Sequence, residues 1–326
     1  TALVVLFILF TTAGNLLTIC VIVKSKRLRS ISNIYLASLA CADMVVGSFV
    51  MIFMLLFTVS HDNIWVFGDA LCRIWTFVDF TCCSASLTNV CLIARDRYRT
   101  VSQPLKSIRK RTKKGAMYRI LLAWAIPLIF WATAISLLAV ADDSPNSNSC
   151  EVKWNPTFIV LIATLAMMYL PIAAILVLFG AMMTFLHNHM TSMNFDLQRT
   201  ESVRRQQSFA SVMSEDATSE KSGGISFNPK CSIEATHPAE RQNSVEKSRL
   251  KQQVSAAKTL GIIMGFLLLC WIPYSILCPL KAYWPDAIPR SAYQASIWVN
   301  YMNSAINPII YCLCNPQFRH AYAQLL

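Results

Sequence analysis

Seven stretches of the chain are apolar over a length that could cross a lipid bilayer. A spanning helix needs about 20 apolar residues, because it rises about 1.5 Å per residue and the hydrocarbon core is about 30 Å thick. Lipid offers no hydrogen-bond partners to the backbone, so a spanning segment must be a helix or part of a closed barrel. The seven runs cover residues 2–24, 32–59, 71–101, 117–140, 157–187, 254–282 and 291–313. We therefore predict an all-α membrane protein, a bundle of seven transmembrane helices.

Composition agrees with this prediction. Of the 326 residues, 55% are hydrophobic and only 14% are charged, which is more apolar than a soluble globular domain. The first apolar run is too long for the core of a signal peptide and is interpreted as a true span.

Charge in the connections predicts the orientation. The first, third and fifth connections are rich in lysine and arginine, including Lys26, Arg27, Arg109, Lys110 and Lys251. The other connections carry mainly aspartate. Since basic loops stay in the cytoplasm, the N-terminus is expected outside and the C-terminus inside. The net charge of +12 is assigned to these loops, and no nucleic-acid partner is expected.

Four regions follow along the chain. Residues 1–189 hold spans one to five, and residues 249–313 hold spans six and seven. Residues 190–248 are polar without an apolar period, which predicts a disordered third cytoplasmic loop. Two Arg-x-x-Ser patterns in this loop match kinase sites, although such short patterns also arise by chance. Residues 314–326 are amphipathic and predict a short helix on the membrane surface.

Two cysteines lie where a disulfide would form. Cys72 opens the third run at its outer end, and Cys150 lies in the outer loop between runs four and five. Both face an oxidising compartment, so we expect a bond that holds this loop over the mouth of the bundle. The alternative is two free thiols.

The third run carries a carboxylate inside the bilayer. Asp79 lies seven residues beyond Cys72, about 10 Å deep in a helix. A lone carboxylate at that depth is costly and indicates a functional site with a cationic partner. Aromatic residues that could surround an ammonium group occur in the outer halves of several runs, namely Trp75, Phe80, Trp271, Tyr274, Trp298 and Tyr301.

A second carboxylate, Asp43, also lies within a span and has no basic residue at similar depth. Oxygen ligands suit a hard cation, so an allosteric sodium ion held by Asp43, Ser86, Asn303 and Ser304 is one hypothesis. The alternative is a protonated Asp43 in a water-bridged network. No other cofactor is expected.

Several motifs occur in order along the spans: Gly14-Asn15, Leu39-Ala40-Cys41-Ala42-Asp43, Cys72 with Asp96-Arg97-Tyr98, Trp124, Cys270-Trp271-Ile272-Pro273, Asn307-Pro308-Ile309-Ile310-Tyr311 and Phe318. With this combination, nearly the whole chain resembles a rhodopsin-like (class A) G-protein-coupled receptor. The position of Asp79 before Arg97 is similar to that in biogenic-amine receptors, whose aspartate pairs with the protonated amine. The nearest resemblance within them is to histamine and muscarinic acetylcholine receptors.

The resemblance implies a cell-surface receptor with a small cationic amine as ligand. The expected ligand-binding residues are Asp79, Trp75, Phe80, Cys83, Thr164, Met167, Trp271, Tyr274, Ser275, Trp298 and Tyr301. The fifth span lacks the serines of catechol-binding relatives, so a histamine- or acetylcholine-like ligand is expected before a catecholamine.

The same resemblance implies a heterotrimeric G protein at the cytoplasmic face, with kinases and arrestin there and membrane lipid around the bundle. Residues expected to serve coupling and activation are Asp96, Arg97, Tyr98, Pro171, Pro273, Asn307, Pro308 and Tyr311. Gln253 stands where an acidic partner of Arg97 is often found, which predicts raised basal activity.

Two other interpretations stay open. One is an orphan or constitutively active class A receptor with a non-amine ligand. The other is a secondary transporter that uses the intramembrane carboxylates as relay groups. An enzyme is not expected, because the sequence has no paired metal-ligand motif or nucleophile elbow.

Overall fold

The computed structural model describes residues 2–60, 64–103, 111–140, 150, 152, 154–218, 261–262 and 264–325. The regular structure within these residues is helical throughout. The chain forms two bodies, of which one comprises Thr1–Gly180 with Lys258–Leu326 and the other Ala181–Ala257. Each body is described separately.

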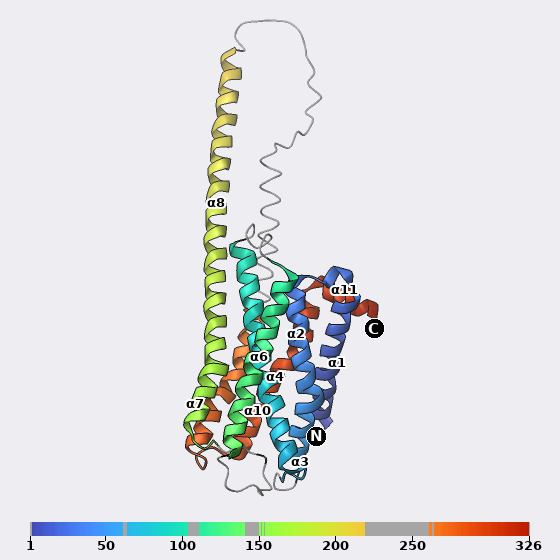
Figure 1. Cartoon of the computed structure of the whole chain (residues 1–326). Helices are drawn as coiled ribbons and strands as arrows, with labels where there is room; N and C mark the ends of the chain where they lie inside the picture. Colours follow the sequence, from blue (N-terminus) through green and yellow to red (C-terminus); the bar gives the residue numbers. More distant parts are fainter. Residues whose placement is uncertain are drawn as a thin grey trace. The chain divides into compact units, whose positions relative to one another are not determined.

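The first body contains the predicted bundle, and its helices run side by side in Figure 1. Its spans are α1 (Ala2–Lys24), α2–η2–α3 (Ile31–Val45, Val46–Val50 and Met51–Val59), α4 (Gly68–Ser102), α6 (Lys113–Val140), α7–η4 with the start of α8 (Phe158–Thr164, Leu165–Tyr169 and Leu170–Thr218), the sixth helix (Met264–Tyr283) and α10 (Arg290–Cys314). The all-α membrane fold predicted from the sequence is confirmed.

Six of the described helices are long and apolar enough to cross a membrane, and α10 falls below that measure. The reason lies in its polar side chains, among them Asn300, Asn303, Ser304 and Asn307, all of which are buried. A helix that turns its polar residues into a bundle can be less apolar on average and still occupy the place of a span.

Two spans contain a short π-helical segment that periodicity alone does not predict. In the fifth span, η4 (Leu165–Tyr169) directly precedes Pro171. Proline has no backbone N–H, and the wider turn accommodates the missing hydrogen bond. The Tyr169 hydroxyl at the end of η4 donates to the carbonyl of Ser275, 2.8 Å away on the sixth helix.

Indole N–H groups form hydrogen bonds between neighbouring spans. Trp124 of α6 donates to Ser38 Oγ at 3.0 Å, and Trp131, seven residues later, donates to Ser84 Oγ at 2.9 Å. The two tryptophans lie on one face of α6 because seven residues make about two helical turns. Their hydrogen bonds fix α6 against the second and third spans.

The surface helix expected after the last span is present as α11 (Pro316–Leu325). Its Tyr322 hydroxyl shares a 2.7 Å hydrogen bond with Thr18 of α1. Burial raises the pKa of the Tyr322 phenol, so it stays protonated. Figure 1 places the N-terminus and α3 at one end of the bundle and α11 at the other, as an odd number of spans requires.

The second body differs from the prediction. Helix α8 continues through Thr218, so residues 190–218 are helical where disorder was expected. The sequence gives a physical reason, because neither glycine nor proline interrupts the chain between Gly180 and Gly223. Residues 219–260 of the predicted loop and sixth span, including Gln253, lie outside the described residues.

Candidate functional site

A cavity lies among the outer halves of the spans. Its lining comes from the third to the seventh span and the outer loop: Asp79, Phe80, Cys83, Ser84, Trp131, Trp154, Val160, Ala163, Thr164, Met168, Trp271, Tyr274, Cys278, Ile297, Asn300 and Tyr301. Most of these side chains are apolar or aromatic, with a few polar groups among them. Such a lining is typical of small-molecule sites.

Asp79 supplies the negative charge of this cavity. Its Oδ2 accepts a hydrogen bond from the Tyr301 hydroxyl at 2.9 Å, and its Oδ1 accepts one from Cys83 Sγ at 3.3 Å. Asp79 makes no ion pair with any described residue. Two neutral donors orient the carboxylate but leave its charge uncompensated, so the cavity can bind a cation.

Aromatic rings surround the carboxylate. The Phe80 centroid lies 4.5 Å from that of Trp131 and 6.2 Å from that of Trp154, which reaches the cavity from the outer loop. Trp271 lies in the lining and is buried. Ring faces attract an ammonium group, which adds to the attraction of Asp79.

Seven of the predicted ligand-binding residues line this cavity: Asp79, Phe80, Cys83, Thr164, Trp271, Tyr274 and Tyr301. Trp75 lines a second, outer cavity. Met167, Ser275 and Trp298 line neither of these two cavities.

The three residues that line neither cavity make contacts elsewhere. Met167 lies inside η4, where the wider turn changes the helical phase, and Met168 faces the cavity in its place. Met167 packs with Trp131 and Ala163 instead. The Ser275 hydroxyl donates to the carbonyl of Ile272. Trp298 packs edge-on against Tyr301, with ring centroids 5.8 Å apart.

Several lining residues were not predicted, notably Trp131, Trp154, Cys278 and Asn300. Trp131 could have been found from its seven-residue spacing after Trp124. Cys278 could have been found from its spacing of seven after Trp271, which places both on one face of a helix. Trp154 has no periodic signal, because it lies in a loop.

The outer cavity adjoins the same carboxylate and includes Asp79, Trp154 and Lys281 in its lining. The expected disulfide between Cys72 and Cys150 is confirmed, with Cα atoms 5.7 Å apart. It holds the outer loop at the end of α4, and the loop residues Cys150, Val152 and Trp154 line the outer cavity.

A separate polar cluster surrounds the fully buried Asp43. Ser86 and Ser304 donate their hydroxyls to Oδ1 at 3.0 and 2.9 Å, and Asn307 donates Nδ2 to Oδ2 at 2.7 Å. The expected grouping is therefore present for Asp43, Ser86 and Ser304. Asn307 joins this group through its hydrogen bond to Asp43. Asn303 lies one turn earlier on α10 and is also buried.

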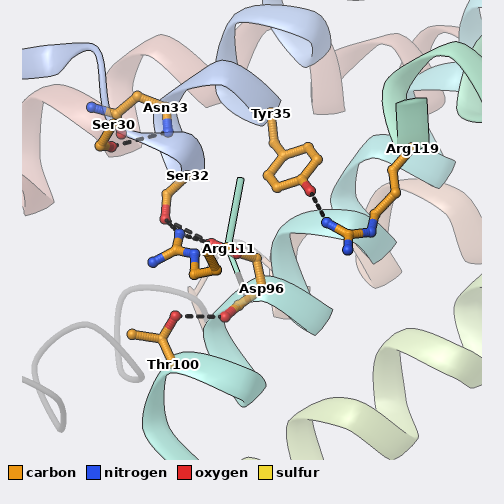
Figure 2. A network of polar contacts seen from close by, with 8 residues as sticks. All are labelled: Ser30, Ser32, Asn33, Tyr35, Asp96, Thr100, Arg111 and Arg119. Carbon is orange, nitrogen blue, oxygen red and sulfur yellow. Dashed lines mark hydrogen bonds and ion pairs between the residues drawn. The ribbon is translucent and has the colours of Figure 1, made fainter. Parts of the chain in front are cut away.

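At the opposite end of α4, Asp96 is held in a polar network. Its Oδ2 accepts from Arg111 Nη2 and from Ser32 Oγ, both at 2.7 Å, and Arg111 also donates to Ser32 at 2.9 Å. Figure 2 shows these three side chains converging, with Tyr35 and Arg119 joined by a 3.1 Å hydrogen bond beside them. Arg111 was not among the residues predicted from the sequence.

The other residues expected to serve activation lie along the spans. Arg97 makes no ion pair within the described residues. Pro308 approaches Gly14 of α1 so closely that a Cβ on the glycine would lie 3.1 Å from the proline ring. Tyr311 lies near the surface helix, with its ring 5.7 Å from that of Phe318.

Comparison with known proteins agrees with this geometry. Residues 14–311 match the family model described as 7 transmembrane receptor (rhodopsin family). The human alpha-1A adrenergic receptor is 31% identical over 321 residues, which cover 98% of this chain and 66% of the relative. The mouse alpha-1D adrenergic receptor is 27% identical over 98% of this chain and 56% of its own length.

The chain thus spans less than two thirds of the length of these relatives. Their names do not support the histamine or muscarinic likeness expected from the sequence. They do support the wider expectation of an aminergic receptor. The chain belongs to the rhodopsin-like (class A) family of seven-transmembrane receptors.

Proposed function

We propose that the chain binds a small extracellular amine through an ion pair between the ligand's ammonium group and Asp79. One observation carries this proposal: a half-buried carboxylate in an aromatic cavity has two neutral donors and no cation among the described residues. The N-terminus and the disulfide-held loop are assigned to the outside, and the cavity then opens toward extracellular ligand.

The fifth-span lining bears on which amine binds. Its contributions to the cavity are Val160, Ala163, Thr164 and Met168, and none of these is a serine. The Thr164 hydroxyl donates to the carbonyl of Val160 at 2.6 Å, so its proton is already engaged. Two catechol hydroxyls would find few partners here. Although the relatives are named adrenergic receptors, we infer an amine without a catechol, as in the histamine- or acetylcholine-like ligands.

Ligand binding is proposed to favour one of two arrangements of the bundle. The sixth helix, with Pro273, and the seventh, with Pro308, each lack one backbone hydrogen bond and can bend at that point. Their movement would expose Arg97 to a heterotrimeric G protein. Kinases and arrestin are proposed to bind the same face afterwards.

Asp43, Ser86 and Ser304 supply oxygen atoms that suit a sodium ion, and Asp43 makes no ion pair within the described residues. We infer that sodium binds there and stabilises one arrangement. The chemistry of the donor set supports this inference, with Asn307 in place of Asn303 beside the carboxylate.

A panel of histamine, acetylcholine, serotonin, tyramine, octopamine and dopamine tests the amine proposal, with G-protein activation in cells as the readout. We expect one or more amines to activate the receptor and Asp79→Ala to abolish the response. Asp69→Ala is the matched control, because Asp69 lies in the exposed first turn of the same helix. Equal signalling with and without every amine would favour the constitutive or orphan alternative.

A further inference from the structure

Asn300 stands out in the ligand cavity because its side-chain oxygen has no partner. The residue belongs to α10, is 6% exposed and lines the cavity that contains Asp79. Its Oδ1 atom accepts no hydrogen bond from any described residue. Buried polar atoms are nearly always hydrogen-bonded, so such an exception calls for an explanation.

The position of Asn300 places this acceptor near the carboxylate. It directly precedes Tyr301, whose hydroxyl donates to Asp79 Oδ2 at 2.9 Å. Consecutive residues of a helix are separated by about 1.5 Å along its axis and about 100° around it. Asn300 and Asp79 line the same cavity, from α10 and from α4.

The ammonium group itself can supply the missing donors. A primary ammonium carries three N–H bonds, a tertiary one carries one, and a quaternary one carries none. Asp79 already accepts one hydrogen bond on each oxygen, and each keeps room for another. An ammonium with more than one N–H can donate to Asp79 and to the Asn300 oxygen together.

We propose that Asn300 determines specificity by selecting ligands whose charged nitrogen keeps several N–H bonds. This inference rests on the amine function proposed above and narrows it to primary and secondary amines. A quaternary ammonium would still pair electrostatically with Asp79 but would leave the Asn300 oxygen buried without a partner. The proposal thus favours a histamine-like amine over an acetylcholine-like one.

The test uses 2-phenylethylamine and histamine, each with its side-chain nitrogen bearing zero, one, two or three methyl groups. Affinities are measured on the full chain in detergent by ligand-induced thermal stabilisation, and potencies by G-protein activation. The receptors compared are the wild type, Asn300→Ala, Asn300→Ser and Asp79→Ala. Ser296→Ala serves as control, because Ser296 is also buried on α10 but lines neither of the two cavities.

In the wild type and Ser296→Ala, affinity should fall about tenfold or more from the primary to the trimethylated ligand, a change of about 1.4 kcal/mol. In Asn300→Ala the fall should shrink to about threefold, because no acceptor remains to be left unpaired. Asn300→Ser keeps a smaller acceptor and should lie between them. This second substitution also keeps the test valid if the alanine variant folds poorly.

Equal falls in the wild type and both Asn300 variants would overturn the inference. If amine binding in that case still depends on Asp79, the amine function stands and Asn300 bridges to a neighbour through water. If no amine of either series binds in an Asp79-dependent manner, both proposals are refuted.

Discussion

Replacing Arg111 by methionine should lower the thermal stability of the bundle. Arg111 Nη2 lies 2.7 Å from Asp96 Oδ2, and the change removes this ion pair while keeping a long apolar side chain. Asp96 is 9% exposed, whereas the Arg111 side chain is 27% exposed. The carboxylate would keep its hydrogen bond from Ser32 but lose its positive partner.

The magnitude follows from this partial burial. Removing one partner of a fully buried pair costs about 3–5 kcal/mol, while an exposed pair contributes about 0–1 kcal/mol. Arg111 lies between these cases, and its buried Nε has no partner among the described residues, which already weakens the native contact. We expect a loss of about 1–3 kcal/mol. At about 2 °C per kcal/mol for a chain of this size, the midpoint should fall by about 2–6 °C.

A thiol-reactive dye measures this without any ligand. Cys82, Cys270 and Cys278 are free and buried, so they react when the bundle opens. Arg119→Met is the matched control, since Arg119 is an arginine of the adjoining helix α6 and donates to the neutral hydroxyl of Tyr35. Its effect should be about 0.5–1.5 kcal/mol, as for an ordinary hydrogen bond.

A midpoint for Arg111→Met equal to that of the wild type would refute the reasoning. A double-mutant cycle with Asp96→Asn sharpens the test, because residues in contact should show a coupling of about 0.5–3 kcal/mol. Additive effects would mean that the contact contributes nothing to the folded state.

Three further predictions concern other contacts. Tyr301→Phe removes the donor that orients Asp79 and should weaken amine binding about tenfold, since a hydrogen bond to a charged group contributes about 1.5–3 kcal/mol; unchanged competition binding would contradict this. Gly47→Ala should lower the midpoint in the dye assay by several degrees, because a Cβ there would lie 2.8 Å from Thr12 Oγ1; an unaltered midpoint would show that the second span can move away from α1. Sodium chloride, compared with potassium chloride at equal ionic strength, should raise the midpoint of the wild type but not of Asp43→Asn, and equal shifts would exclude a sodium site at this carboxylate.

Much of the bundle could be predicted, because a membrane-spanning helix is defined by its own apolar length. The expected first run, 2–24, coincides with α1, and the expected third run, 71–101, lies within α4. The position of Asp79 on a helix face was likewise predictable, since 3.6-residue periodicity holds along α4. Its aromatic surroundings followed from residue type and approximate depth.

Features that depend on helical phase or on loops could not be predicted from the sequence. The π-helical turn before Pro171 rotates the residues around it, so Met168 replaces Met167 in the lining. Asn303 and Asn307 lie one turn apart on the same face of α10, and sequence does not fix which one reaches Asp43.

Contacts made from loops carry no periodic signal at all. Arg111 lies before the first turn of α6, outside any helix, and pairs with Asp96. Trp154 reaches the cavity from the disulfide-held loop in the same way.

The indole hydrogen bonds of α6 have a consequence for assembly during synthesis. Trp124 and Trp131 donate to partners in the second and third spans. These residues all precede residue 140, so they are synthesised before the last three spans. The first four spans can therefore associate before the rest of the chain is made. Asp43 and Asp79, by contrast, take hydrogen bonds from α10, which is synthesised last among the spans. Until that last span inserts, Asp43 has only the Ser86 donor and Asp79 only the Cys83 donor, so the polar groups of the bundle are completed at the final step of synthesis.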